Sequence, residues 1–300
     1  MENSDYDVVI VGGSYAGLSA GMALGRALRK VLIIDNGKPC NIQTPHSHNF
    51  LTQDGATPAA IAEIARAQVS AYPTVEMLTG SVLSVEGSNN DFVINTDLNK
   101  TFTAKKVLFA TGVKDIMPDI PGLAACWGIT VIHCPYCHGY EVRNQKTGIL
   151  TNGEAALDFA QLINNWTKDL TIFTNGEATF SEETRNKIEN LGVTINEKLI
   201  SEIEHENGKL RQIAFPDGTT TVLSALYARL PFTQHTDIPE KLGCEMNEHG
   251  LIKTDEMKRT SVSGIYAAGD NTTMMRAVSG AVAAGGMAGA MINRDIIGGL

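Results

Sequence analysis

The feature that most constrains the fold is a glycine turn that joins a buried strand to a helix near the start of the sequence. Residues 6–11 (YDVVIV) form a continuous apolar, β-branched run, which is typical of a strand buried on both faces. A glycine turn at 12–13 follows, and residues 16–28 have a helical pattern. Residues 30–34 form a second apolar run, which ends at Asp35. Because parallel strands need a crossover, the chain is predicted to begin with a βαβ unit.

The turn itself predicts a dinucleotide site. Residues 12–17 (GGSYAG) approximate the pattern G-x-G-x-x-G, with Ser14 at the middle glycine. Such a turn lets backbone N–H groups approach a pyrophosphate at the helix N-terminus, whose dipole favours anions. Asp35 follows the second strand, where a carboxylate about 20 residues on can accept hydrogen bonds from ribose hydroxyls.

The composition disfavours several classes of function. The chain has 300 residues, enough for one large or two ordinary domains, and a formal net charge of −9. Nucleic acids and anionic membranes require a basic surface, so we expect neither as a partner. No secretory signal is recognised, and the weakly polar stretch 278–291 is shorter than the roughly 20 apolar residues of a spanning helix. The five cysteines contain a single close pair, which disfavours a disulfide framework and favours a cytoplasmic location.

The strand–turn–helix plan is partly repeated further along the chain. Residues 147–150 and 169–174 have strand patterns on either side of a helical segment at 155–165. A last buried strand at 263–268 is expected to return to the first sheet. The predicted fold is therefore α/β, with two Rossmann-like, three-layer nucleotide-binding domains, the second inserted into a discontinuous first one. The predicted boundaries are 1–114 and 243–300 for the first domain and 115–242 for the inserted domain.

The central motif is HCPYCHGYE at residues 133–141. Two thiols three positions apart can close a small ring, and a thiolate near a helix N-terminus or a cation has a lowered pKa. Zinc is an alternative, but structural zinc sites take four ligands, often from two pairs, and the sequence has no second CxxC. CPYC is also the glutaredoxin active-site tetrapeptide, yet here it follows a complete nucleotide-binding unit. The pattern favours a redox-active Cys134/Cys137 pair.

Taken in order, these motifs resemble one family over essentially the whole chain. The chain resembles the low-molecular-weight thioredoxin reductases, which are FAD-dependent pyridine nucleotide-disulfide oxidoreductases. The resemblance rests on VVIVGGSYAGLSA (8–20), Asp35, Asn49-Phe50, FATG (109–112), CPYCHGYE (134–141), TSVSGIYAAGD (260–270) and the following Arg276-Ala277-Val278.

The resemblance implies an FAD domain, an inserted pyridine-nucleotide domain and a homodimer. It implies that Cys137 faces the flavin and that Cys134 exchanges with an external substrate, either a thioredoxin-like protein or a small dithiol or disulfide. Asp270 would bind the ribitol region, and the N–H of Ala277 would face the flavin's pyrimidine edge. The implied FAD-binding residues are Gly12, Ser14, Tyr15, Ala16, Gly17, Asp35, Asn49, Val82, Thr111, Gly112, Asp270, Arg276, Ala277 and Val278.

The chain departs from the family pattern directly after the second cysteine. His138 stands where the family usually has an aspartate that serves as a proton donor. An imidazole can perform the same task, with a reference pKa nearer neutrality. His133 is a second candidate. The expected catalytic residues are therefore Cys134, Cys137, His138 and His133, and no metal is expected.

A second departure concerns NADPH. The inserted domain should carry G-x-G-x-x-A and then a basic cluster, but its turn reads TNGEAA (151–156), with Thr151 at the first glycine. Glu154 adds negative charge there, and no lysine or arginine lies between Lys168 and Arg185. A 2′-phosphate would lack a cation, so NAD(P)H use is doubtful. The pattern resembles a branch of dithiol oxidases similar to those that close the disulfides of gliotoxin and holomycin.

Three functions therefore compete. The first is an FAD-dependent thiol/disulfide oxidoreductase that is not driven by NADPH, such as a dithiol oxidase. The second is an NAD(P)H-dependent thioredoxin or disulfide reductase, and the third is a non-catalytic flavoprotein or zinc-bearing interaction module. We expect Cys40, Cys126 and Cys244 to be packing residues, and His46 and His48 to form hydrogen bonds within a loop.

Overall fold

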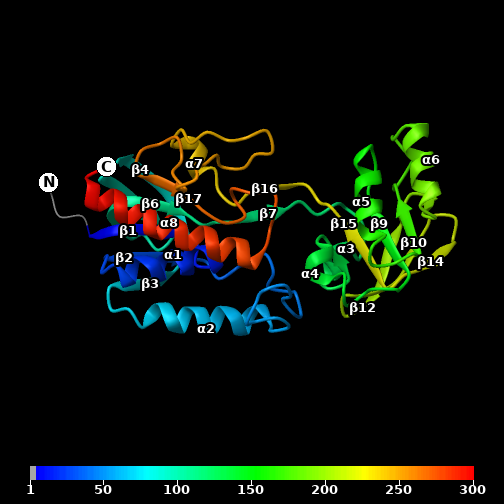
Figure 1. The fold of residues 1–300 in the computed structure, drawn as a ribbon, viewed down its shortest axis with the longest axis horizontal. Helices are drawn as coiled ribbons and strands as arrows, with labels where there is room; N and C mark the ends of the chain where they lie inside the picture. Colours follow the sequence, from blue (N-terminus) through cyan, green and yellow to red (C-terminus); the bar gives the residue numbers. More distant parts are fainter. Residues whose placement is uncertain (1–4) are drawn as a thin grey trace.

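The chain forms two bodies, each built around its own sheet, which are joined by a pair of extended segments (Figure 1). The structure is a computed structural model that describes residues 5–300. In Figure 1, the first body carries both chain ends, and the second contains the green and yellow middle of the chain. The predicted fold class, two Rossmann-like units in an α/β protein, is confirmed.

The first sheet has a parallel core with an antiparallel extension. Its strand order is β3-β2-β1-β6-β5-β4, and β17 also pairs with β6. The first four strands of this order and β17 run parallel, whereas β5 and β4 run antiparallel to their neighbours. The strands are β1 (Tyr6–Val11), β2 (Val31–Asp35), β3 (Val75–Thr79), β4 (Val82–Ser88), β5 (Asp91–Thr96), β6 (Thr101–Phe109) and β17 (Ile265–Ala267).

Three helices cover one face of this sheet. They are α1 (Tyr15–Arg26), α2 (Pro58–Ser70) and α8 (Val278–Gly298). α1 and α8 pack closely because Gly285 has no side chain: a Cβ there would lie 2.0 Å from the carbonyl oxygen of Ala16. The opposite face packs against α7 (Ile238–Lys241) and the irregular chain that follows it. Among residues 5–300, no helix is both long and apolar enough to cross a membrane.

The second sheet is entirely parallel, in the order β11-β10-β9-β15-β8. Its strands are β8 (Val131–Ile132), β9 (Thr147–Leu150), β10 (Leu170–Phe173), β11 (Thr194–Asn196) and β15 (Ala225–Ala228). α5 (Ala155–Ile163) and α6 (Glu182–Asn190) cover one face. The other face packs on α3 (Leu123–Cys126) and a small sheet of β12 (Glu202–Glu206), β13 (Lys209–Ala214) and β14 (Thr220–Val222).

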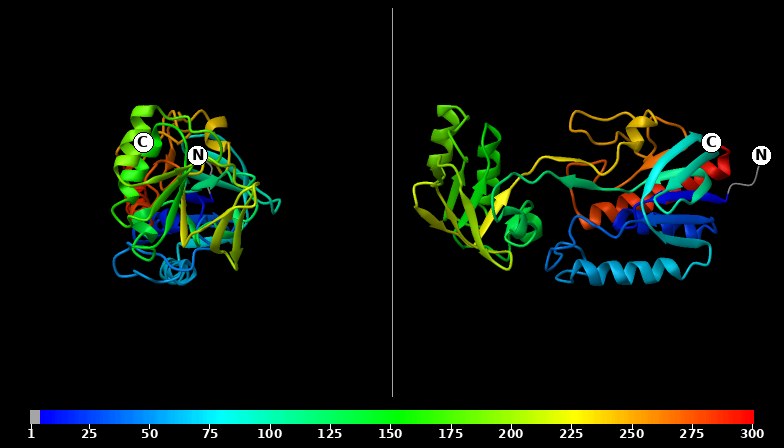
Figure 2. Two further views of the ribbon diagram at one scale, coloured as in Figure 1. Left: turned by 90° about the vertical axis from the view of Figure 1, so that its right-hand side faces the viewer. Right: turned by 180° about the vertical axis from the view of Figure 1, so that it is seen from behind.

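The two bodies are connected by β7 (Val113–Asp115) and β16 (Phe232–Gln234), which pair antiparallel. The right view in Figure 2 shows the bodies apart except at this connection and around α4 (Pro135–His138). The first sheet takes its strands from both sides of the second in the sequence, as an inserted domain requires. The domain boundaries at 114/115 and 242/243 stay a prediction.

Candidate functional site

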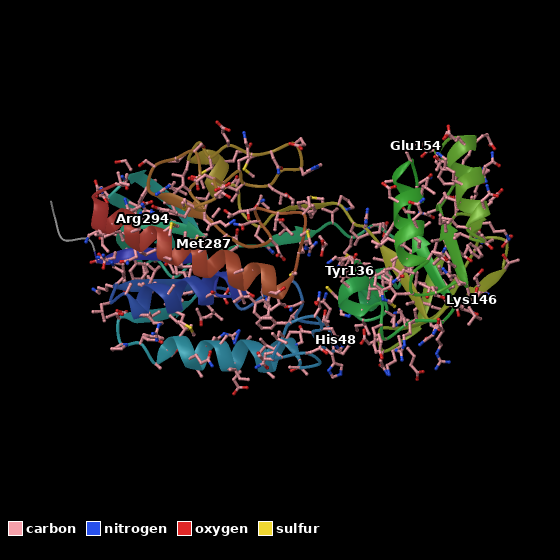
Figure 3. The ribbon with its side chains drawn as sticks, in the orientation of Figure 1. His48, Tyr136, Lys146, Glu154, Met287 and Arg294 are labelled. Carbon is pink, nitrogen blue, oxygen red and sulfur yellow. The ribbon has the colours of Figure 1, made fainter. Side chains whose placement is uncertain are left out.

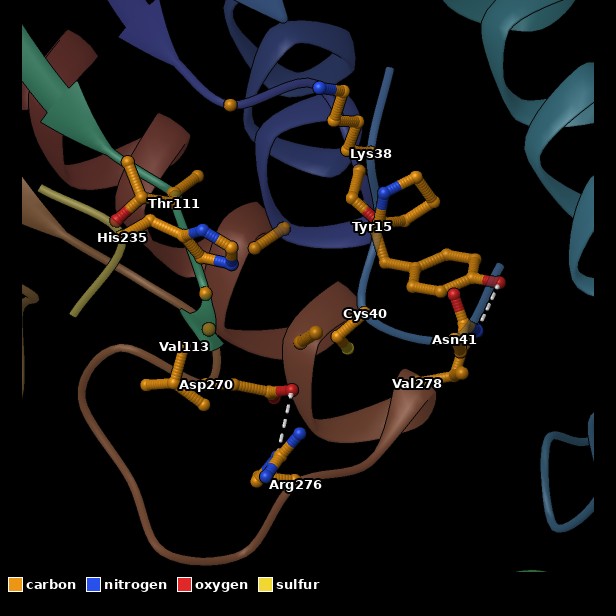
Figure 4. A pocket seen from close by; sticks show the side chains of 18 of the residues that line it. Tyr15, Lys38, Cys40, Asn41, Thr111, Val113, His235, Asp270, Arg276 and Val278 are labelled. Carbon is orange, nitrogen blue, oxygen red and sulfur yellow. Dashed lines mark hydrogen bonds and ion pairs between the residues drawn. The ribbon is translucent and has the colours of Figure 1, made fainter. Parts of the chain in front are cut away.

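A cavity of about 350 Å³ opens where the strands of the first sheet end. The carboxyl ends of β1, β2, β6 and β17 meet at one edge of the sheet, which is where open α/β sheets bind ligands. Residues 127–138 of the second body complete its wall. Figure 4 shows part of this lining, with Tyr15, Asp270 and His235 around the same space.

Two glycines let the turn beside this cavity pack closely against neighbouring backbone. A Cβ at Gly12, which has φ +105°, would lie 2.3 Å from the carbonyl oxygen of Ala110. A Cβ at Gly17 would lie 1.9 Å from the carbonyl oxygen of Gly12. Helices α1 and α8 both begin at this cavity, so their positive ends favour an anionic ligand.

Most of the residues expected to bind FAD line this one cavity. Gly17 does not line it; it lies behind the turn and allows α1 to approach. The remaining expected FAD-binding residues all face the cavity: Gly12, Ser14, Tyr15, Ala16, Asp35, Asn49, Val82, Thr111, Gly112, Asp270, Arg276, Ala277 and Val278.

Two carboxylates and an arginine set the charge at the end of the cavity nearest α8. Arg276 donates to both carboxylate oxygens of Asp115, at 2.6 and 3.2 Å, and its Nε lies 3.8 Å from Asp270. Burial raises the pKa of Asp270 to about 6, although the positive charge of Arg276 opposes the shift. Asp270 is therefore a carboxyl group that can change charge near neutral pH.

Four further residues of the lining were not singled out by the sequence motifs. Asp115 belongs to β7, Trp127 directly follows α3 in the second body, His235 follows β16, and Cys40 lies in the loop after β2. Trp127 Nε1 donates to Asp115 at 3.2 Å. The expectation that Cys40 is a packing residue is wrong, because its side chain faces the cavity (Figure 4). No local pattern marks these residues, since only the fold brings them together.

The cysteine pair lies at the carboxyl end of β8, where α4 begins. The Cys137 thiol donates to the sulfur of Cys134 across 2.7 Å. This contact, helped by backbone N–H groups of Cys137 and Tyr136, lowers the pKa of Cys134 to about 7, whereas burial opposes the shift. The same contact and burial raise the pKa of Cys137. Cys137 lines the cavity and Cys134 does not, so the two thiols have different surroundings.

Both candidate histidines also line the cavity. Burial, and then the charge of Arg276, lower the pKa of His133 to about 4, so this side chain stays neutral at pH 7. Burial and the neighbouring His48 lower the pKa of His138, whereas Glu141 opposes the shift. Within the described part of the chain, His133 Nε2 and Arg276 Nε are buried without a hydrogen-bond partner.

The nucleotide-type turn of the second body is filled by its own side chains. Asn152 Oδ1 accepts from the backbone N–H of Thr179 at 2.8 Å, and its amide donates to the carbonyl oxygen of Glu177 at 2.9 Å. Glu154 Oε1 accepts from the backbone N–H of Ser181 at 2.6 Å, and Glu154 Oε2 accepts from the Thr184 hydroxyl at 2.5 Å. In Figure 3, Glu154 lies at the far end of the second body from Tyr136 of α4.

No group of three or more histidine, cysteine, aspartate or glutamate side chains in residues 5–300 is placed to hold a metal ion.

Comparison with known proteins identifies the family. The sequence profile of the pyridine nucleotide-disulphide oxidoreductases matches residues 6–285. The chain belongs to this family. It is thioredoxin reductase-like, and this pyridine nucleotide-disulphide oxidoreductase is an FAD-dependent enzyme that acts on sulfur groups.

The similarity extends over whole chains. The thioredoxin reductase sirT of Leptosphaeria maculans is 35% identical, covering 98% of this chain and 95% of that protein. The thioredoxin reductase tcpT of Claviceps purpurea is 31% identical, covering 97% of this chain and 94% of its own. The crystal structure of the oxidoreductase from Agrobacterium tumefaciens superposes with a TM-score of 0.91 at 38% identity, covering 97% of this chain and 98% of its own.

The cavity of this oxidoreductase fits FAD. The glycine turn and the N-terminus of α1, which both line the cavity, suit a pyrophosphate, and Asp35 faces the same space. The unpartnered Nε atoms of Arg276 and His133 supply buried polar groups that a bound molecule can satisfy. The expectation that FAD is the cofactor is confirmed by the family.

Proposed function

We propose that the protein is a thiol/disulfide oxidoreductase that moves electrons between the Cys134/Cys137 pair and FAD and takes them from a dithiol rather than from NADPH. Three placements support the cysteine roles. Cys134 has the lowered pKa that favours its release as a thiolate, Cys137 lines the cavity, and His138 follows Cys137 on the same short helix. Cys134 is the exchanging thiol, and Cys137 is the thiol that faces FAD.

The proposed exchange begins with the cysteine pair as a disulfide. A substrate thiolate attacks Sγ of Cys134, and Cys137 leaves as a thiolate. The second substrate thiolate then attacks the substrate sulfur of this mixed disulfide, which forms the substrate disulfide and releases Cys134. His138 accepts a proton lost by the substrate thiols. FAD, when bound, accepts the two electrons that the reduced pair gives up as its own disulfide reforms.

The observation that carries the choice of donor is the filled turn of the second body. A Rossmann turn binds phosphate through free backbone N–H groups, but the N–H of Gly153 in this turn donates to Asn152 Oδ1 at 2.9 Å. Asn152 and Glu154 also accept from the N–H groups of Thr179 and Ser181, which hold the following loop against the turn. Glu154 also places a carboxylate where a nucleotide would bring negative charge.

The first basic residue after β10, the strand that follows this turn, is already paired. Arg185 is the first basic residue after Lys168, and it lies 2.7 Å from Glu197 and 3.7 Å from Glu182. A 2′-phosphate would have to displace Glu197 from the guanidinium group of Arg185. The turn therefore disfavours NADPH through its shape and its charge.

A single anaerobic experiment tests the donor. Mix the oxidised yellow holoenzyme with NADPH, with NADH, or with a small dithiol, and follow flavin absorbance in a stopped-flow instrument. We expect the dithiol alone to bleach the flavin within the turnover time, and air to restore the colour. Rapid bleaching by NADPH or NADH would contradict the proposal. Cys134→Ser should abolish bleaching by the dithiol, because the exchanging thiol is lost.

The second candidate is an NAD(P)H-dependent thioredoxin or disulfide reductase. It is favoured by the names of the relatives, since both sirT and tcpT are described as thioredoxin reductases. The same stopped-flow experiment separates the two, because a reductase is bleached by the nicotinamide. A thioredoxin-like protein is then the substrate to test. The homodimer and the cytoplasmic location stay predictions, for which sedimentation and cell fractionation are the tests.

A further inference from the structure

His48 joins the loop after β2 to the cysteine segment of the second body. Its Nε2 lies 3.6 Å from Glu141 Oε1, and its ring meets the ring of His138 edge-on, with 6.5 Å between centroids. Figure 3 shows His48 on the side of the first body that faces α4 and Tyr136. His48 is thus a cavity-lining side chain that contacts the residue next to Cys137 from outside the motif.

The charged groups around His48 form a short series between the cavity and the surface. Its Nδ1 lies 3.6 Å from Asp54 Oδ1 within its own loop, and the ring of His46 lies at 6.4 Å. The side chain of His48 is 21% exposed, whereas Glu141 is 41% and Asp54 is 68% exposed. Burial therefore decreases outward from His48 to the two carboxylates.

A buried imidazole that exchanges protons needs a fixed orientation and a route to solvent. The short helix α4 fixes the backbone of His138, but its ring lies against another segment of the chain. His48 is that neighbour, and its own ring nitrogens face carboxylates on both sides. These two contacts hold the ring of His48 in place against His138.

We propose that His48 is a positioning residue for His138: it holds the imidazole beside the cysteine pair and controls the exchange of its proton with Glu141, Asp54 and solvent. The inference rests on the proposed thiol/disulfide function, because only a reaction that moves thiol protons uses His138. The proposal means that a residue of the first body takes part in the thiol/disulfide reaction of the cysteine pair in the second body.

The test compares two substitutions that remove charges of opposite sign. His48 lowers the pKa of His138, whereas the Glu141 carboxylate raises it. His48→Asn keeps a polar side chain of similar reach, and we expect the midpoint of the ascending limb of the curve of dithiol turnover against pH to move to higher pH. Glu141→Gln removes the carboxylate, and we expect this midpoint to move to lower pH. Turnover at neutral pH should fall about tenfold in His48→Asn, less than a lost general base costs.

Two readouts do not depend on turnover. The ring signals of His138 can be titrated by NMR in histidine-labelled holoenzyme, with His138→Asn used for the assignment. The alkylation rate of Cys134 in the reduced protein can be measured across the same pH range. Both midpoints should shift in the same two directions. Shifts of one sign in both variants, or no shift in either, would overturn the inference.

His249 provides the matched control. Its Nε2 lies 3.7 Å from Glu248, so it repeats the histidine–carboxylate contact, but it does not line the cavity. His249→Asn should leave the turnover limb, the His138 titration and the Cys134 midpoint unchanged. If a dithiol does not bleach the flavin of the wild-type protein, the proposed function is wrong, and the NMR titration of His138 still tests the role of His48. If bleaching holds and the titrations do not move, only the role of His48 is lost.

Discussion

Asp270 stands at the carboxyl end of β17, inside the cavity and close to Arg276. Its carboxyl group is buried, and burial disfavours the charged form. The folded protein therefore holds this proton at pH values at which the unfolded chain has released it. Such a group makes stability depend on pH in a direction opposite to that of a salt-bridged carboxylate.

The first prediction concerns this pH dependence. Because the pKa of Asp270 is raised from 3.8 to about 6, we expect the stability of the flavin-free protein to fall as the pH rises through this range. A shift of about two units corresponds to about 3 kcal/mol. Asp270→Asn cannot titrate, so the difference between the two proteins in urea unfolding should grow from pH 4 to pH 6. Parallel stability curves for the two proteins would contradict the assignment.

Individual residues were predictable where a motif marks them. Gly12, Asp35 and Asp270 each follow a buried strand, and parallel strands bring such positions to one edge of a sheet. Asp115 and Trp127 have no such mark, because their contact exists only after the second body has folded against the first. Sequence reasoning could place the first group in a cavity, but it had no means of finding the second.

The short helix α4 sets the different pKa values of the two cysteine thiols. Cys134 is its N-terminal capping residue, and Cys137 lies one turn later. The Cys137 thiol is the largest cause of the lowered pKa of Cys134, ahead of the backbone N–H groups. The helix therefore makes one thiol reactive by making the other a hydrogen-bond donor.

The second prediction separates these two causes. In the reduced protein, the alkylation rate of Cys134 should have a midpoint near pH 7, because its pKa is lowered to about 7. Cys137→Ala removes the donor, so the midpoint should move to higher pH. Cys137→Ser retains a hydroxyl donor and should keep the midpoint nearer to that of the wild type. Equal midpoints in the alanine and serine variants would assign the effect to the backbone instead.

At the level of elements, patterns succeeded where burial is strong. The expected strands at 6–11 and 147–150 match β1 and β9, because both are apolar and fully enclosed. β3 was missed: its residues VEMLT are largely exposed at the edge of the sheet, so no apolar run marks it. The weakly polar stretch 278–291 lies in α8, which continues to Gly298 because its packed face extends to the buried Asp295.

At the scale of the whole molecule, one buried ion pair lies where the two bodies meet. Asp115 and Arg276 have side chains that are only 6% and 13% exposed, and Trp127 donates to the same carboxylate. Asp115 belongs to β7, Arg276 precedes α8, and Trp127 belongs to the second body. We expect this cluster to hold the orientation in which Cys137 faces the cavity.

The third prediction is that Asp115→Asn loosens this orientation. Removing one partner leaves a buried charge uncompensated, so we expect the free energy of unfolding to fall by about 3 kcal/mol. Trp127 should become more exposed, which red-shifts its fluorescence, and X-ray scattering should show a broader particle. Asp237→Asn is the control, because the Asp237–Lys241 pair is exposed and contributes at most about 1 kcal/mol. Equal effects of the two substitutions would remove the cluster from this role.

The filled turn at Asn152 and Glu154 has a consequence for the order of events in time. If the proposed function holds, the second body has no separate binding site for an electron donor. Donor and acceptor must then visit the same cavity region in alternation, and the oxidised product has to leave before the acceptor arrives. The catalytic cycle then consists of two half-reactions, and the enzyme is in its reduced form between them.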